Sequence, residues 1–208
     1  MKRSMMAMAT VAMLGLSACG GDSPPAANDA AKDAAPAASA TAPAATAAVS
    51  TDAELEQLKT VAPVDACAWL TPEKLAAEYP GLKFEVHQKV DPQISGYVWD
   101  SRCVYWAGVG SIDFAKDAPT HTVEIFVATS VSEDKAQAKL ASRHEMAPST
   151  TGYQAQPALG ANAHTTIDTG MARLFFVKGQ SEVQINVSDL KTPNAEKVKK
   201  AIALANSL

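Results

Sequence analysis

Residues 23–50 form a low-complexity segment that cannot supply a hydrophobic core. Of its 28 residues, 14 are alanine and 4 are proline, and Val49 is its one large apolar side chain. Alanine alone favours helix, but the prolines interrupt it, so we expect a flexible tether rather than an Ala-rich helix. The folded part must then lie in residues 51–208, where Leu, Val, Ile and aromatic residues become frequent. That length suits a single domain.

The segment before the tether has the pattern of an export signal. Lys2 and Arg3 precede the apolar residues 5–18, a run shorter than the about 20 residues that cross a bilayer. The sequence LSAC at residues 16–19 resembles the bacterial lipobox, which implies that Cys19 is acylated and becomes the first mature residue. The alternative is an ordinary signal peptide with an incidental cysteine. We therefore predict a signal peptide over 1–18 and an acylated cysteine with its tether over 19–50.

The resemblance to lipoproteins also implies a location. In those proteins an aspartate after the cysteine favours retention at the inner membrane, whereas here Gly20 follows and the first acid is Asp22. The periplasmic face of the outer membrane is therefore favoured over the inner membrane or another cell membrane. The net charge of −4 becomes more negative once Lys2 and Arg3 are removed, and this argues against nucleic acid as a partner. The expected partners are the membrane, through the lipid, and an unknown envelope protein, peptidoglycan or small ligand.

Residues 51–208 contain the periodicities of strands and helices. Strands are predicted over 82–90, 101–109, 121–129, 163–168, 171–178 and 182–188. The first is expected to be half-buried, with one side formed by Leu82, Phe84, Val86 and Val90. In 121–129 the inward side chains are expected to be Val123, Ile125 and Val127. The dipeptides 169–170 and 179–180 suit tight hairpins.

Helix-start signals separate these strands. Capping boxes begin at Thr51 and Ser130, the latter opening a helix to about Met146. Thr71 followed by proline opens a helix that should stop near Tyr79, and a last helix begins at 192–193. Residues 148–161 are expected to form a polar loop. The predicted fold class is α+β: a mostly antiparallel sheet of about six strands packed with helices, after a disordered N-terminal segment.

The chain has three cysteines, and acylation of Cys19 leaves Cys67 and Cys103. We predict a structural disulfide between them, since an exported domain lies in an oxidising compartment. The redox and zinc alternatives are weaker, because there is no Cys-x-x-Cys motif and no suitably spaced histidine.

The segments CAWLTPEKLAAEYP (67–80), CVYW (103–106), ALGANA (158–163) and the hairpin MARLFFVKGQSEVQINV (171–187) are similar to a family of uncharacterised bacterial cell-envelope lipoproteins. The resemblance implies a small antiparallel sheet packed with helices, as in the PsbP/Mog1-like fold. It implies no chemistry and no catalytic residue.

No motif in the sequence points to a reaction, a metal or a cofactor. The triplet at 168–170 matches aspartic proteases, but it occurs once and lacks the flanking residues of that family, so a hairpin turn is the better interpretation. The histidines at 87, 121, 144 and 164 lack metal-ligand spacing. The aromatic residues near Cys103 are mostly expected in the core, packed against the disulfide. If any lines a ligand groove, Tyr97 or Trp99 is expected to, because 95–101 has loop character.

These inferences predict a non-enzymatic, lipid-anchored cell-envelope protein that acts as a binding or accessory module. The alternative is a periplasmic hydrolase whose site is assembled only in three dimensions. A deep pocket joining titratable groups from different elements would favour the hydrolase, and a shallow apolar or aromatic groove would favour the binding module.

Overall fold

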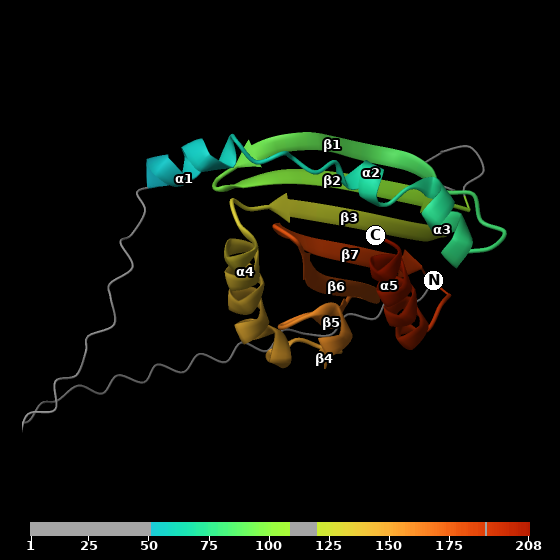
Figure 1. Ribbon diagram of the computed structural model, residues 1–208. Helices are drawn as coiled ribbons and strands as arrows, with labels where there is room; N and C mark the ends of the chain where they lie inside the picture. Colours follow the sequence, from blue (N-terminus) through green and yellow to red (C-terminus); the bar gives the residue numbers. More distant parts are fainter. Residues whose placement is uncertain (1–50, 109–119, 190) are drawn as a thin grey trace, which may run out of the picture. The chain divides into compact units, whose positions relative to one another are not determined.

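The computed structural model describes residues 51–108, 120–189 and 191–208 (Figure 1). The predicted signal peptide, Cys19 and the tether lie outside these residues. The described part contains one antiparallel sheet of seven strands in the order β1-β2-β3-β7-β6-β5-β4. The strands are β1 (Glu85–Ser95), β2 (Val98–Ala107), β3 (His121–Thr129), β4 (Gln154–Ala155), β5 (His164–Asp168), β6 (Met171–Lys178) and β7 (Ser181–Asp189).

Five α-helices accompany the sheet in the described residues. They are α1 (Thr51–Leu58), α2 (Ala66–Trp69), α3 (Pro72–Glu78), α4 (Glu133–Met146) and α5 (Asn194–Ser207). The α+β class is thus confirmed. The seventh strand, β4, and two short 3-10 turns, Ala147–Ser149 and Pro157–Leu159, lie in the segment expected to be a loop. None of the helices in the described residues is long and apolar enough to cross a membrane.

The helix boundaries follow from local caps. The Thr71 hydroxyl accepts a hydrogen bond from the backbone N–H of Lys74, and α3 ends before Tyr79, as predicted. The prediction that Ser130 caps α4 was wrong, because Ser132 accepts from the N–H of Lys135 and fills that position. Ser130 instead follows the last residue of β3, where its N–H donates to the carbonyl oxygen of Gln180 at 2.8 Å.

The two faces of the sheet carry different helices. Val123, Ile125 and Val127 of β3 are buried as predicted, in a core that also contains residues of α2, α3 and α5. Arg143 of α4 contacts Glu182 and Phe175, which alternate along their strands with core residues. Helix α4 therefore covers the opposite face, here called the α4 face. In Figure 1 the strands run between α4 at one end and α3 and α5 at the other.

The prediction of a half-buried strand over 82–90 was wrong in its extent and burial. Strand β1 begins at Glu85, lies at the edge of the sheet and is largely exposed, including Val86 at 48%. A shift in register between Val86 and Gln88 breaks the alternation on which the prediction rested. Phe84 is buried, but it precedes the strand and packs edge-on against Tyr79, with ring centroids 5.2 Å apart.

The hairpin predictions at 169–170 and 179–180 are confirmed. Thr169 and Gly170 both have positive φ angles, of 47° and 80°, which a two-residue hairpin turn of this hand requires. The protease-like triplet is thus the end of β5 and a turn, and Asp168 forms an ion pair with Arg173 across that hairpin.

Candidate functional site

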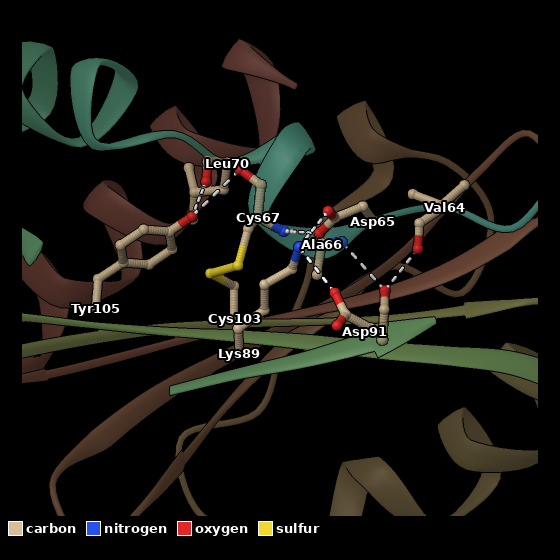
Figure 2. The surroundings of a disulfide bond; sticks show 10 residues. Val64, Asp65, Ala66, Cys67, Leu70, Lys89, Asp91, Cys103 and Tyr105 are labelled. Atoms are coloured by element: carbon tan, nitrogen blue, oxygen red, sulfur yellow. Dashed lines mark hydrogen bonds and ion pairs between the residues drawn. A yellow bond between two sulfur atoms is a disulfide. The ribbon is translucent and has the colours of Figure 1, made fainter. Parts of the chain in front are cut away.

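The disulfide between Cys67 and Cys103 is present and ties α2 to β2 (Figure 2). Cys103 is fully buried in the core, on β2 between β1 and β3. Cys67 lies in the one-turn helix α2, which sequence periodicity did not reveal because four residues are too short for a helical pattern. The predicted pairing is therefore borne out.

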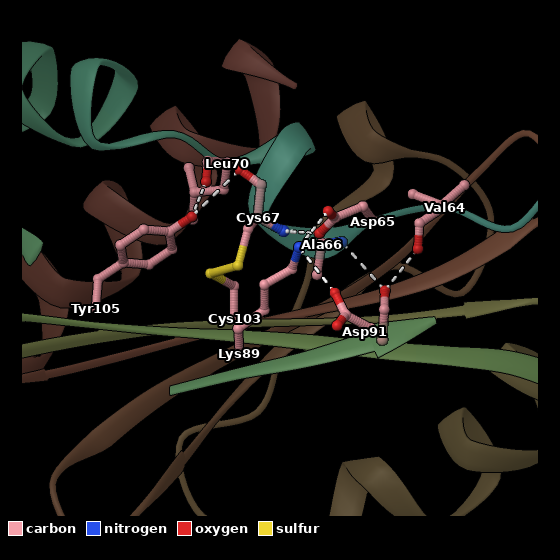
Figure 3. A network of polar contacts seen from close by, with 10 residues as sticks. Val64, Asp65, Ala66, Cys67, Leu70, Lys89, Asp91, Cys103 and Tyr105 are labelled. Carbon is pink, nitrogen blue, oxygen red and sulfur yellow. Dashed lines mark hydrogen bonds and ion pairs between the residues drawn. A yellow bond between two sulfur atoms is a disulfide. The ribbon is translucent and has the colours of Figure 1, made fainter. Parts of the chain in front are cut away.

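A polar network on either side of the disulfide also connects α2 to the sheet (Figure 3). The buried Ser101 hydroxyl donates to the carbonyl oxygen of Val64 at 2.7 Å and accepts from the N–H of Ala66 at 3.1 Å. The Tyr105 hydroxyl donates to the carbonyl oxygen of Leu70, and burial raises the pKa of Tyr105 to about 12. Lys89 of β1 pairs with Asp65, the N-cap of α2. Together these contacts fasten α2 and the residues beside it to β1 and β2.

The two aromatic residues singled out for a ligand groove have different positions. The segment 95–101 is not a loop: Ser95 pairs with Val98, so only Gly96 and Tyr97 form the turn, and Trp99 lies within β2. The Trp99 indole N–H donates to the carbonyl oxygen of Leu58 at 2.9 Å and holds the end of α1. Tyr97 is 47% exposed and lines a pocket. A role for Tyr97 in ligand binding stays a prediction, and Trp99 has a structural contact instead.

A pocket of about 350 Å³ lies on the α4 face, in the range typical of small-ligand sites. We call it the sheet pocket. Strands β1, β2, β3 and β7 and helix α4 contribute its lining, which includes Gln93, Asp100, Arg102, Phe126, Arg143 and Gln184. It is open to solvent on one side. These residues come from positions up to 91 apart in the chain, so no local sequence signal could group them.

Two arginines in the sheet pocket are held in place by carboxylates and aromatic rings. Arg102 forms an ion pair with Glu124, and its guanidinium lies 4.9 Å from the centroid of the Phe126 ring. Arg143 donates from Nε to Glu182 at 2.6 Å, and its guanidinium lies 5.0 Å from the Phe175 ring centroid. Both guanidinium groups keep exposed surface, so they can donate hydrogen bonds to a polar ligand.

The sheet pocket also contains a carboxylate without a close cation. Asp100 makes no ion pair within 4 Å among the described residues. Burial raises the pKa of Asp100 above its ordinary value, and Glu182 adds to this effect, while a hydrogen bond with Ser95 and the charge of Lys139 oppose it. The pocket therefore presents donors and acceptors together, which suits hydrogen bonding to a polar ligand more than binding of a simple ion.

A second pocket, of about 410 Å³, lies next to the first, and we call it the Tyr97 pocket. It is lined by Glu54 of α1, by Tyr97, Val98 and Ser130, and by Lys135, Ala138, Lys139 and Ser142 of α4. On β2, Val98 shares a strand face with Asp100 and Arg102, which line the sheet pocket. The two pockets thus follow one another between α4 and β2.

Two of the four histidines come together, which the sequence did not predict. The rings of His144 and His164 lie 5.3 Å apart, and His144 Nε2 is 2.8 Å from the Tyr153 hydroxyl. His164 is 1% exposed and stacks on Phe175 at 5.0 Å. Burial lowers the pKa of His164, and the neighbouring His144 and Arg143 act in the same direction. The His164 ring belongs to the packing between α4 and β5 rather than to an open site.

His121 lies between a hydroxyl and a carboxylate. Its Nδ1 is 2.9 Å from the Thr120 hydroxyl oxygen, and its Nε2 is 3.6 Å from a carboxylate oxygen of Asp189. The Thr120 hydroxyl also lies 3.3 Å from the Ala107 carbonyl oxygen. The other Asp189 oxygen accepts the N–H groups of Lys191 and Thr192. Burial raises the pKa of Asp189, but these hydrogen bonds outweigh it and leave that pKa below its ordinary value. Neither described pocket is lined by His121 or His164.

Within the described ranges, no three residues of the metal-binding types lie close enough together to hold an ion. The stacked pair of His87 and Trp106, with ring centroids 3.2 Å apart, is a further contact between β1 and β2.

No protein-family model matches the chain, and no curated protein matches it. Among solved structures, the chain is similar to the extracellular domain of PknH from Mycobacterium tuberculosis. The TM-score is 0.47 and the identity 13%, over 70% of this chain and 96% of that one. A similarity of this size assigns neither a family nor a function.

Proposed function

We propose that this protein is a lipid-anchored cell-envelope protein whose folded domain binds a ligand and catalyses no reaction. The anchoring part is supported by the disulfide: Cys67 and Cys103 are bonded to each other, so Cys19 is the one cysteine of the chain left for acylation. Structural disulfides persist in oxidising compartments, which agrees with an export signal. The proposed location is the periplasmic face of the outer membrane, with residues 23–50 as the tether.

Substitution of Cys19 tests the anchor. The full chain and its Cys19→Ser variant are expressed in the native host, the cells are fractionated, and the intact mass of each product is measured. We expect the unmodified chain in the outer-membrane fraction with the added mass of diacylglycerol, and the variant without that mass in the soluble periplasm. A variant that remains membrane-bound would contradict lipid anchoring through Cys19.

The binding part is carried by one observation: two adjoining pockets between α4 and the sheet, each large enough for a small ligand or part of a larger one. The polar side chains of the sheet pocket are fixed before any ligand arrives, because Arg102 and Arg143 each have a carboxylate partner and an aromatic ring beneath them. Preorganised groups reduce the entropy lost on binding. An envelope protein, a segment of peptidoglycan or a small molecule could supply the polar groups.

Photo-crosslinking in cells tests binding. A benzophenone amino acid replaces Gln93, an exposed residue that lines the sheet pocket. The matched control carries it at Lys199, which is exposed on α5 and thus on the other side of the sheet. We expect a defined adduct from position 93, identified by mass spectrometry, and none from position 199. Absence of an adduct at 93, or the same adduct at both positions, would contradict ligand binding in this pocket.

One feature favours the hydrolase alternative: His121 lies between the Thr120 hydroxyl and the Asp189 carboxylate. These are the residue types of a nucleophile, base and acid. However, Asp189 already accepts two backbone N–H groups, and the Thr120 hydroxyl can donate to the Ala107 carbonyl oxygen, so structural roles account for both groups. Assays with activated esters on the full chain and on His121→Ala decide between the two. Hydrolysis that is lost in the variant would overturn the non-catalytic proposal.

A further inference from the structure

We infer that the Tyr97 pocket binds a small anion with an apolar body, of the class of aliphatic or aromatic carboxylates. This inference rests on the proposed binding function and specifies the chemistry of one ligand. Three properties of the pocket carry it: an excess positive charge, a buried hydroxyl without a partner, and an apolar wall with an exposed aromatic ring.

The charge comes from the lysines of α4. Lys135 lies 3.3 Å from Glu54, so these two charges compensate each other. Lys139 lines the same pocket one helical turn further on and makes no ion pair within 4 Å among the described residues. The acid that influences it, Asp100, belongs to the adjoining sheet pocket. Counting the charged residues that line it, Glu54, Lys135 and Lys139, the Tyr97 pocket has one positive charge more than it has negative charges, and a single anionic group would balance it.

The unpartnered hydroxyl belongs to Ser130. This residue is 2% exposed, and although its backbone N–H is hydrogen-bonded, its side-chain Oγ has no partner. Buried polar atoms are nearly always paired, so an unpaired one that lines a pocket requires an explanation. Because Ser130 lines the pocket, a rotation of its side chain would let a carboxylate oxygen accept the hydroxyl proton, and the Lys139 ammonium would balance the charge.

The remaining wall suits the apolar part of such a molecule. Val98 and Ala138 contribute aliphatic surface, and the Tyr97 ring is half exposed at the tip of the β1–β2 hairpin. Covering an exposed aromatic ring with an apolar group removes apolar surface from water and therefore favours binding. A small inorganic anion would leave this wall in water, and a neutral apolar molecule would leave both Ser130 and Lys139 unsatisfied.

Calorimetric titration tests the inference on the full-length Cys19→Ser chain, which has no lipid to compete for the probe. The probes are octanoate and 3-phenylpropionate, with octanol and octylammonium as neutral and cationic controls. We expect both carboxylates, or one of them, to bind at least fivefold more tightly than either control. The difference between the two carboxylates shows whether the natural ligand is aliphatic or aromatic.

Variants locate the site. Lys139→Met keeps the aliphatic stem and should weaken carboxylate binding about fivefold to tenfold without affecting octanol. Ser130→Ala should weaken it about threefold and should not lower the free energy of unfolding, because its hydroxyl has no partner to lose. Lys199→Met, on α5, should change nothing. Equal binding of octanol or octylammonium, or carboxylate binding that neither variant weakens, would overturn the inference.

The two proposals can fail separately. If the carboxylates do not bind while position 93 crosslinks a partner in cells, this inference is wrong and the proposed binding function stands. If the carboxylates bind through Lys139 and Ser130 while the Cys19→Ser variant stays in the membrane, the ligand class stands and the proposed anchor is wrong.

Discussion

The indole Nε1 of Trp99 lies 2.9 Å from the carbonyl oxygen of Leu58, forty-one residues earlier in the chain. This hydrogen bond joins the start of β2 to the last residue of α1, a helix of eight residues. An isolated helix of that length is not stable in water, so α1 depends on contacts of this kind. Glu54, a residue of the Tyr97 pocket, is positioned by the same helix.

Replacement of Trp99 by phenylalanine should release α1. The ring remains but the N–H donor is lost, and we expect the free energy of unfolding to fall by about 1 kcal/mol. Amide hydrogen exchange over residues 51–61 should become faster, while exchange in β3 changes little. Trp69→Phe is the matched control, since Trp69 has no side-chain hydrogen bond in the described structure. Unchanged exchange in α1 would show that this bond does not hold the helix.

Removal of the disulfide should destabilise the domain considerably. Cys67 and Cys103 are 36 positions apart, and closing a loop of this length contributes about 2–4 kcal/mol. Urea unfolding of the Cys67→Ala/Cys103→Ala variant, in a Cys19→Ser background, should show this loss. A reductant should destabilise the parent by a similar amount and should leave the double variant unaffected. Equal stability of the two proteins would contradict the prediction.

Replacement of Arg143 should lower the free energy of unfolding, because the buried Glu182 carboxylate loses its ion-pair partner. Glu182 is 6% exposed, and Arg143 is its one ion-pair partner among the described residues. Arg143→Met should lower the free energy of unfolding by about 1–3 kcal/mol, because the charge of Glu182 stays buried without compensation. Adding Glu182→Gln should recover part of this loss.

Lys199→Met is the control for that experiment. It removes an exposed ion pair with Glu196 and should change the free energy of unfolding by about 0.5 kcal/mol or less. Chemical unfolding of the parent, Arg143→Met, Glu182→Gln and their double variant measures the coupling. If Arg143→Met and Lys199→Met have the same small effect, burial of Glu182 is not the source of the stabilisation.

The buried His164 should make stability depend on pH. Its pKa is lower in the folded protein than in the unfolded chain, so the unfolded chain binds more protons as the pH falls past about 6.5. The free energy of unfolding should therefore be highest near pH 7 and decrease towards pH 5, by at most about 1.4 kcal/mol per pH unit from this residue.

Urea unfolding between pH 7 and 5 tests this, with His164→Gln as the variant and the exposed His87→Gln as its control. The dependence of the free energy of unfolding on pH should become weaker in His164→Gln and should stay unchanged in His87→Gln. Asp189 and Asp65, whose pKa values are lowered by folding, affect stability only at lower pH. A slope that His164→Gln leaves unchanged would contradict the assignment.

The elements that were predicted correctly depend on interactions within a few residues. The Thr71 cap, the alternation of Val123, Ile125 and Val127, and the turn at Thr169 each operate over less than ten positions. The residues that stabilise each of these features therefore lie within the same short stretch of sequence. The disulfide was also predictable, although distant in sequence, because assigning Cys19 to a lipid left one pairing.

The wrong predictions concern features that depend on tertiary contacts: the cap of α4 and the burial of Val86. The sequence favoured Ser130 as the cap of α4, because Glu133 follows it by three residues, but the Ser130 N–H bonds to Gln180 beside the end of β3 and Ser132 caps the helix. Val86 has the pattern of an inward residue, but the sheet order places β1 at an edge, where a register shift leaves this side chain in water.

The sequence by itself determined the class of fold, most element boundaries and the cysteine pairing. Only the tertiary structure decided which side chains meet on the α4 face: it separated Trp99 from Tyr97, and placed Ser130 beside the lysines of α4. The reason is physical. Local periodicity fixes the direction of a side chain relative to its own element, but a pocket depends on how several elements pack together, and that is set by the burial of the whole core.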